Sequence, residues 1–239
     1  MTNLMTNPIV ILQARCNSKR LPGKVLKKIK NIPIIILCVK RLENKGHRVI
    51  VATSKKRSDD KLVLLLKKNN IDYFRGKLND VFSRFIKIIK INNLKKNMLV
   101  VRATADNILP DGNLIEIITK KFKTIKNNYL RIDNNLHNLP KGFTLEIFKA
   151  NELLKLNKVK LSKKHLEHVT FKIYENKRNY NNILIEEIKQ KQNLNNLRVT
   201  IDNKNDFDFM NKLFKKVKNP YNENSLKILN YLKNNNYHE

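Results

Sequence analysis

Residues 11–26 of the chain read ILQARCNSKRLPGKVL. An apolar run ends at Leu12, and several cations follow it within a dozen residues. Pro22 and Gly23 then allow the chain to turn, because proline fixes φ and glycine tolerates a positive φ. The loop offers donors for phosphate oxygens: Arg15, Ser18, Arg20 and Lys24. Such a loop either holds an anionic ligand or is merely solvated, and the loop alone does not decide between the two.

Predicted strands and helices alternate along the first half of the chain. Short apolar runs indicate buried strands at residues 8–12, 48–54, 71–76 and 98–106. Apolar residues at helical spacing indicate helices at residues 33–44, 58–70, 79–93 and 111–128. This alternation predicts an α/β fold with a central, mostly parallel sheet between helices. In such sheets, ligands bind at the carboxyl ends of the strands.

The second half of the chain is less regular. We predict strands at residues 129–132, 143–149, 183–188 and 197–202. We predict helices at residues 150–156, 163–176, 204–218 and 223–233. Because the sequence shows no internal repeat and no linker-like stretch, we expect a single domain over residues 1–239.

The composition indicates a globular protein with a strongly basic balance. Apolar residues make up 41% of the 239 residues, and the formal net charge is +30. Such a charge suggests nucleic acid as a partner. The lysines, however, are spread among asparagines and isoleucines and form no basic block. We therefore expect no nucleic-acid partner, and a basic nucleic-acid-binding protein is the less favoured alternative.

The sequence gives no sign of membrane insertion or secretion. No apolar run approaches the roughly 20 residues that a membrane helix needs. The first residues lack the basic and apolar regions of a signal peptide. Two cysteines, Cys16 and Cys38, are too few for a disulfide framework. We expect a cytoplasmic protein with no membrane partner.

Two acidic residues follow predicted strands that are far apart in the sequence. Asp106 ends the run MLVVRATAD, and Asp202 ends the run LRVTID. At the carboxyl ends of two central strands, both would lie on the same edge of the sheet as the first loop. Mg²⁺ takes one or two protein carboxylates and completes its shell with water and substrate phosphates. Each acid alone could equally cap the following helix, but the pair together with the basic loop favours a metal–nucleotide site.

Arginine is the minority cation, and several arginines follow or end predicted strands. Arg75, Arg102 and Arg198 occupy such positions, and Arg84 lies on a predicted helix. Arginine can hold a phosphate or carboxylate with two parallel hydrogen bonds. Structural salt bridges are the other open interpretation for each of them.

The segment QARCNSKRLPGKVL resembles the opening signature of bacterial cytidylyltransferases of the spore-coat polysaccharide biosynthesis branch. That branch is related to the synthetases of CMP-sialic acid and CMP-3-deoxy-octulosonate. Further segments resemble this family in the same order: IVATS…DD (50–60), FRGKLNDVFSRF (74–85), VVRATAD (100–106), EHVT (167–170) and LRVTIDNKNDF (197–207). One motif would be weak evidence, whereas the ordered set is strong evidence for the family.

The resemblance implies a Rossmann-like, GT-A-like nucleotidyltransferase fold with CTP as the donor and Mg²⁺ as the cofactor. It implies a nucleotide-binding set: Gln13, Ala14, Arg15, Ser18, Arg20, Lys24, Arg75 and Arg84. It implies a catalytic set: Arg15, Lys24, Asp106 and Asp202. The two aspartates would hold the metal. Glu146 and His168 would face the acceptor.

The reaction implied by the resemblance is attack of an acceptor oxygen on the α-phosphorus of CTP, with release of pyrophosphate, for surface polysaccharide biosynthesis. The acceptor would be a sugar acid or another small anionic compound, and the chain would form a homodimer. Lys141 and Thr144 stand where the family often carries acids, which puts the acceptor in doubt. The alternative is an enzyme of the same fold that uses another nucleoside triphosphate or a sugar phosphate.

Overall fold

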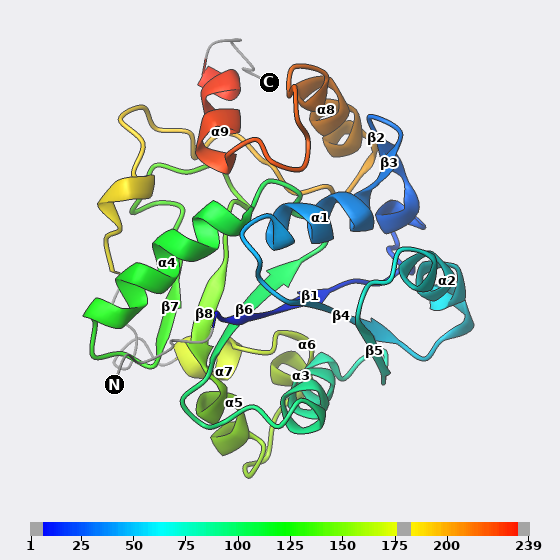
Figure 1. Cartoon of the computed structure of the whole chain (residues 1–239), viewed down its shortest axis with the longest axis vertical. Helices are drawn as coiled ribbons and strands as arrows, with labels where there is room; N and C mark the ends of the chain where they lie inside the picture. The colour runs from blue at the N-terminus through cyan, green and yellow to red at the C-terminus, as the bar shows by residue number, and fades with distance from the viewer. Residues whose placement is uncertain (1–6, 176–182, 234–239) are drawn as a thin grey trace.

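A central sheet of six strands organises residues 7–175 and 183–233, which the computed structural model describes (Figure 1). The strands lie in the order β5–β4–β1–β6–β8–β7. Their bounds are Ile9–Gln13 for β1, Val49–Ser54 for β4, Tyr73–Gly76 for β5, Leu99–Thr104 for β6, Tyr129–Arg131 for β7 and Glu146–Lys149 for β8. Neighbours among β5, β4, β1 and β6 are parallel, whereas β8 runs antiparallel to β6 and β7. The predicted mixed, mostly parallel sheet is confirmed.

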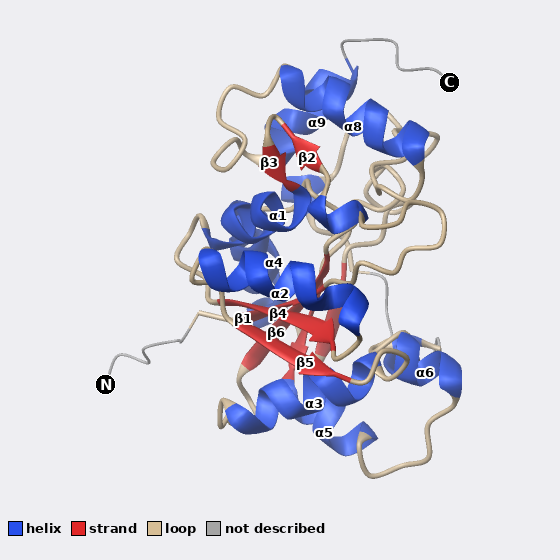
Figure 2. Ribbon diagram, turned by 90° about the vertical axis from the view of Figure 1, so that its right-hand side faces the viewer, coloured by secondary structure: helices blue, strands red, loops and turns tan. Residues whose placement is uncertain are grey.

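Helices cover both faces of the sheet, as Figure 2 shows. One face packs against α1 (Ile34–Glu43), α2 (Asp60–Lys68) and α4 (Gly112–Thr124). The other face packs against α3 (Val81–Ile91) and α5 (Ala150–Leu156). The remaining α-helices are α6 (Lys163–Glu167), α7 (Phe171–Tyr174), α8 (Lys204–Lys215) and α9 (Ser225–Lys233). This arrangement leaves the carboxyl ends of the parallel strands at one edge of the sheet.

The side chains of β1 explain why its sequence is a continuous apolar run. Val10 and Leu12 belong to the core under α1, and Ile9 and Ile11 belong to the core under α3. Successive side chains of a strand point to opposite faces, so a strand covered by helices on both sides has no polar positions. Gln13 is the first polar residue of this strand, and it emerges at the carboxyl end.

Residues 197–202 were predicted as a strand of the sheet, and this prediction is wrong. The segment passes the loop after β6 and pairs with other segments through isolated bridges, Thr200 with Asn107 and Arg198 with Lys141. The place beside β6 is filled by β8. Apolar residues alternate in this segment because Val199 and Ile201 are buried in the core. The segment does not pair within the sheet.

The prediction of a strand at residues 183–188 is also wrong. Its first residues form a loop, and a short 3₁₀-helix, η4 (Glu186–Ile188), follows. Ile185 and Ile188 are fully buried. The apolar residues therefore anchor a loop to the core.

The helix predicted over residues 163–176 is interrupted. α6 ends at Glu167 and α7 begins at Phe171, while residue 176 lies outside the described residues. His168 leaves the helical region with φ −103° and ψ 67°. The break buries Thr170, which is 1% exposed and contacts Glu146 of β8.

The hairpin β2 (Lys28–Ile29) and β3 (Ile32–Pro33) was not predicted. Its two turn residues both have positive φ, 49° at Lys30 and 63° at Asn31. Two-residue hairpin turns require this geometry, and asparagine accepts it far more readily than lysine. Only Asn31 carried a sequence signal for the turn.

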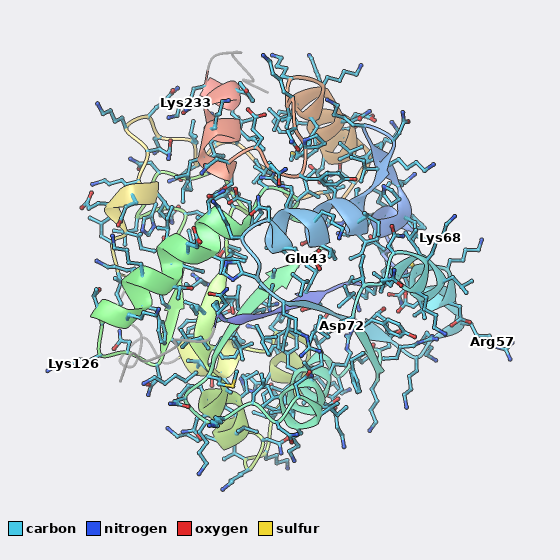
Figure 3. The ribbon with its side chains drawn as sticks, in the orientation of Figure 1. Glu43, Arg57, Lys68, Asp72, Lys126 and Lys233 are labelled. Carbon is cyan, nitrogen blue, oxygen red and sulfur yellow. The ribbon has the colours of Figure 1, made fainter. Side chains whose placement is uncertain are left out.

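Positive charge is spread over the molecule. In Figure 3, the labelled residues Lys68, Lys126 and Lys233 lie in different parts of the chain, on separate sides of the view. Among the described residues, no helix combines the length and the hydropathy needed to cross a membrane.

Candidate active site

A cavity of about 510 Å³ opens at the carboxyl ends of β1 and β6. Its wall contains eight of the predicted site residues: Gln13, Ala14, Arg15, Ser18, Arg20, Lys24, Asp106 and Asp202. The end of β1 supplies Gln13, and the segment that follows it, up to the start of the 3₁₀-helix η1 (Lys24–Leu26), supplies the next five residues. The loop after β6 supplies Asp106, and Asp202 comes from the segment before α8. The structure therefore brings together side chains that are up to 189 positions apart, from 13 to 202.

Glycine and a buried carboxylate fix the loop after β1. Gly23 has φ 65°, a left-handed conformation that glycine adopts without strain, and its N–H donates to the carbonyl of Cys16 at 2.8 Å. The N–H of Cys16 donates to Asp59 Oδ1 at 2.7 Å. Asp59 is fully buried and also accepts hydrogen bonds from Thr53 and Ser54 of β4. Asp59 thereby ties the loop to the neighbouring strand.

Lys24 joins the two predicted metal ligands. Its ammonium Nζ donates to Asp202 Oδ1 at 3.2 Å and to the carbonyl of Ile201 at 2.8 Å, and it lies 3.5 Å from Asp106 Oδ2. The side chain of Lys24 is only 12% exposed. One cation thus lies against two carboxylates from different elements, on the floor of the cavity.

Asp202 is surrounded by positive charge. Arg20 lies 3.3 Å from Asp202 Oδ2, and Arg198 is paired with the same oxygen. Partial burial opposes ionisation, but the charges of Lys24, Arg198 and Arg20 outweigh it and hold the pKa of Asp202 below its usual value. Asp202 is therefore a carboxylate at neutral pH.

The capping alternative for the two aspartates fails. The N-cap of α4 is Asp111, whose side chain accepts from the N–H of Leu114 at 3.0 Å. The N-cap of α8 is Asn203, which forms a capping box with Asp206. Neither Asp106 nor Asp202 satisfies a helix end, and both carboxylates instead line the cavity as partners of Lys24.

The donor set fits a cation that is shared with phosphates. Among the described residues, no cluster of three or more His, Cys, Asp or Glu side chains could hold a metal. Two carboxylates beside a basic loop fit Mg²⁺, which is usually bound by one or two carboxylates together with substrate phosphates. They do not fit a metal bound by protein groups alone.

Arg75 and Arg84 lie outside the cavity wall. Arg84 is fully buried and donates to the carbonyls of Ala52 at 3.0 Å and Leu78 at 3.2 Å. Arg75 donates to the carbonyl of Ser54 and pairs with Asp60 at 2.7 Å. Arg75 thus holds the end of β4 and the loop after it, and Arg84 holds β4 and the loop after β5. Contact of either arginine with nucleotide stays a prediction.

Glu146 and His168, predicted to face the acceptor, also lie outside the cavity wall. Glu146 is 5% exposed and pairs with Arg102 at 2.8 Å. His168 is exposed at the end of α6, and the preceding residue, Glu167, reaches the cavity instead. Glu167 lies 3.7 Å from Arg15.

Several lining residues were absent from the sequence-based set: Asn17, Lys19, Val25, Asn79, Thr104, Ala105 and Glu167. Thr104 is the last residue of β6, and Asn79 follows β5. Both obey the rule that led to Asp106, namely position at a strand end, so that signal was present. Glu167 reaches the cavity from the last position of α6, and it lies in the segment EHVT that resembles the family.

We expect both thiols to be unreactive in the folded protein, although Cys16 lies in the loop of the active site. Burial, with the nearby charge of Asp59, raises the pKa of Cys16 to about 12. Burial also raises the pKa of Cys38. Because the thiolate is the reactive form, Ellman's reagent at pH 8 should titrate no thiol within minutes, and both thiols after denaturation. Fast reaction of one native thiol that Cys16→Ser abolishes would contradict this packing.

Comparison with known proteins assigns the family. A family model described as cytidylyltransferase matches residues 9–236. The chain belongs to the cytidylyltransferase family. It is therefore an enzyme of the nucleotidyltransferase class, and the resemblance found in the sequence motifs is confirmed.

Individual relatives of this cytidylyltransferase cover most of its length. A spore coat polysaccharide biosynthesis protein of Bacillus subtilis is 29% identical over 220 residues, which are 89% of this chain and 88% of the relative. An uncharacterised protein of Methanocaldococcus jannaschii is 35% identical over 202 residues, which are 83% and 79% of the two chains.

Solved structures share the fold of this cytidylyltransferase. A cytidylyltransferase from Leptospira borgpetersenii superposes with a TM-score of 0.82 at 24% identity and covers 96% of this chain and 95% of its own. A CMP-2-keto-3-deoxy-manno-octonic acid synthetase complexed with CTP gives a TM-score of 0.58 at 12% identity, over 88% and 99% of the two chains. The predicted Rossmann-like nucleotidyltransferase fold is confirmed.

Proposed function

We propose that this cytidylyltransferase transfers CMP from CTP to a sugar acid and releases pyrophosphate. One observation carries the proposal: Lys24 joins the basic loop to two carboxylates, Asp106 and Asp202, in a single cavity. Two further points support it. The Bacillus subtilis relative is named for polysaccharide biosynthesis, and a sugar-acid synthetase with the same fold was solved with CTP.

The basic loop would bind the triphosphate. Arg15 and Arg20 have side chains that are 38% and 62% exposed, so both can turn toward a ligand. Lys24 is less exposed and lies deeper, beside the carboxylates. In transfer of the nucleotidyl group, charge builds up on the departing pyrophosphate, and fixed cations at that point lower the barrier.

The two aspartates would hold Mg²⁺. When bound, Mg²⁺ would neutralise phosphate charge and hold the reacting groups in line. The chain's own contribution is to keep two carboxylates 3.2 Å and 3.5 Å from the Lys24 ammonium, in the cavity at the carboxyl ends of β1 and β6. No side chain of the cavity wall is assigned as a general base.

Release of pyrophosphate tests the proposal most directly. The enzyme is incubated with Mg²⁺, each of the four nucleoside triphosphates in turn, and a panel of sugar acids and sugar phosphates. We expect release with CTP and at least one sugar acid. Release only with another triphosphate, or only with a sugar phosphate, would replace the proposed reaction with the alternative enzyme of the same fold.

Arg15→Ala should weaken binding of CTP about tenfold to a hundredfold, the usual contribution of a charge-assisted hydrogen bond. Binding of CMP should change little, because CMP lacks the β- and γ-phosphates. Calorimetry with both nucleotides in the presence of Mg²⁺ measures the difference. The matched control is Arg48→Ala, which removes an exposed arginine that pairs with Asp72 beyond the cavity wall. Equal losses for CTP and CMP would mean that Arg15 does not contact the terminal phosphates.

A further inference from the structure

We infer that Arg102 and Glu146 are positioning residues, which orient the amide of Gln13 so that its NH₂ group donates to an oxygen of the acceptor substrate. This inference rests on the proposed function. It also changes the roles expected from the sequence, in which Gln13 belonged to the nucleotide and Glu146 to the acceptor. Its basis is a chain of polar contacts that crosses three strands and ends at the cavity.

The three side chains share one face of the sheet. Arg102 of β6 is the register partner of Glu146 of β8 and of Ile11 of β1. Gln13 lies two residues beyond Ile11, so the period of two places it on the same face, diagonally from Arg102. The neighbouring positions of this face hold apolar residues of the core under α3, such as Ile11, Val100 and Phe148, and one further cation, Arg131 of β7, which is the register partner of Glu146.

The contacts run from the buried end toward the cavity. Thr170, between α6 and α7, donates its hydroxyl hydrogen to Glu146 Oε2. Glu146 Oε1 accepts from Arg102 Nη1 at 2.8 Å, and Arg102 Nη2 donates to Gln13 Oε1 at 3.3 Å. The side chains of Arg102 and Glu146 are only 14% and 7% exposed. Of the members of this chain, Gln13 lines the cavity.

The chemistry of arginine decides which way the Gln13 amide points. A guanidinium has donors and no acceptor, so the carbonyl oxygen of Gln13 must face Arg102. The NH₂ group then faces away from Arg102 and offers its hydrogens to the cavity. A buried ion pair contributes little stability compared with apolar side chains of similar size. Stability alone is therefore a weak reason for the Arg102–Glu146 pair, whereas its contact with Gln13 gives it a role at the cavity.

The geometry of in-line displacement at phosphorus indicates which substrate group contacts the NH₂ group of Gln13. Lys24 begins the 3₁₀-helix η1 (Lys24–Leu26), which contacts α1, whereas Gln13 projects on the face of the sheet under α3. The attacking and leaving oxygens lie on opposite sides of the phosphorus. If pyrophosphate departs toward Lys24, the acceptor approaches from the side of Gln13. A neutral donor there suits a hydroxyl or carboxylate oxygen of a sugar acid.

The first readout is the side-chain amide of Gln13 in the free, full-length protein, observed by ¹H–¹⁵N NMR. We expect a rigid amide in the wild type and a mobile one in the double variant Arg102→Met/Glu146→Gln. The double variant removes both charges of the Arg102–Glu146 pair together, so that neither partner is left buried without the other. Arg48→Gln is the matched control, because it breaks an arginine–carboxylate pair elsewhere, and it should leave the amide rigid.

The second readout is the rate of pyrophosphate release with CTP and 3-deoxy-octulosonate as the probe acceptor. Gln13→Ala should raise KM for the sugar acid about tenfold, the contribution of one hydrogen bond, with the affinity for CTP unchanged. The Arg102→Met/Glu146→Gln variant should raise this KM similarly, and adding Gln13→Ala to it should cause no further increase. Gln13→Glu keeps the contact with Arg102 but presents an anionic oxygen, so its KM should exceed that of Gln13→Ala.

Three results would overturn the inference: an amide that stays rigid in the double variant, additive effects in the triple variant, or a loss of CTP affinity in Gln13→Ala with an unchanged KM for the sugar acid. The last result would assign the amide to the nucleotide. Absence of pyrophosphate release by the wild type with every sugar acid refutes the proposed function instead. The NMR measurement still decides in that case whether Arg102 and Glu146 position Gln13.

Discussion

Asp106→Asn and Asp202→Asn should each lower turnover by about a hundredfold or more while the chain stays folded. An amide is a much poorer ligand of Mg²⁺ than a carboxylate. A loss of about 3 kcal/mol of charge stabilisation in the transition state corresponds to about a hundredfold in rate. The measurement is pyrophosphate release at limiting and at saturating Mg²⁺. The deficit should be largest at limiting metal.

The matched control is Asp208→Asn. Asp208 lies on the exposed side of α8 and pairs with Lys204, so its variant should keep normal turnover. The caps of α4 and α8 are Asp111 and Asn203, which leaves both helix starts intact in the two active-site variants. Near-normal turnover of both variants at limiting Mg²⁺ would contradict the metal assignment.

The pH dependence of the free energy of unfolding reports the ion pairs of Asp202 without any contribution from a metal. The pKa of Asp202 is depressed by its cationic neighbours despite partial burial. A depressed pKa contributes stability above the unfolded value of about 3.9, and this stability is lost as the pH falls through the folded value. The free energy of unfolding should therefore be larger for the wild type than for Asp202→Asn at neutral pH. This difference in free energy should vanish in strong acid.

The alternating half of the fold could be predicted from sequence because its signals are local. Strands β1, β4 and β6 begin as continuous apolar runs, and helices on both faces demand such runs. The loop 13–24 and Asp106 followed from the same reasoning, since polar residues that end a buried strand meet at one edge of the sheet. Asp202 was expected at this edge for a wrong reason: it reaches the cavity on an extended segment outside the sheet.

The errors concern contacts that depend on tertiary structure. Asp59 lies in the first turn of the helix predicted at residues 58–70, yet its carboxylate is buried and accepts hydrogen bonds from Cys16 and Ser54. Arg84 lies in a family motif, but its guanidinium satisfies backbone carbonyls in the interior. Residue type and spacing cannot distinguish a group that contacts a ligand from one that holds a loop in place, because both need the same hydrogen-bonding capacity.

Lys24→Met should lower turnover by about a hundredfold to a thousandfold, comparable to removal of one preorganised donor from a transition-state site. The same substitution should have a second effect, which concerns metal binding by the nucleotide-free protein. The Lys24 ammonium lies 3.2 Å from Asp202 Oδ1 and 3.5 Å from Asp106 Oδ2. Without it, two carboxylates face each other with less positive charge between them, and a divalent cation should bind more tightly in the absence of nucleotide.

Calorimetry of Mg²⁺ and Mn²⁺ binding to the nucleotide-free protein measures this second effect. Arg20→Met is the matched control, because Arg20 lies 3.3 Å from Asp202, does not pair with Asp106, and is 62% exposed. Its variant should gain less affinity for the metal. If Lys24→Met lowers turnover but leaves metal affinity unchanged, the ammonium acts on the phosphates alone. If affinity rises, wild-type Lys24 competes with the metal until the triphosphate provides another partner for the ammonium, and metal and nucleotide binding are coupled through this one side chain.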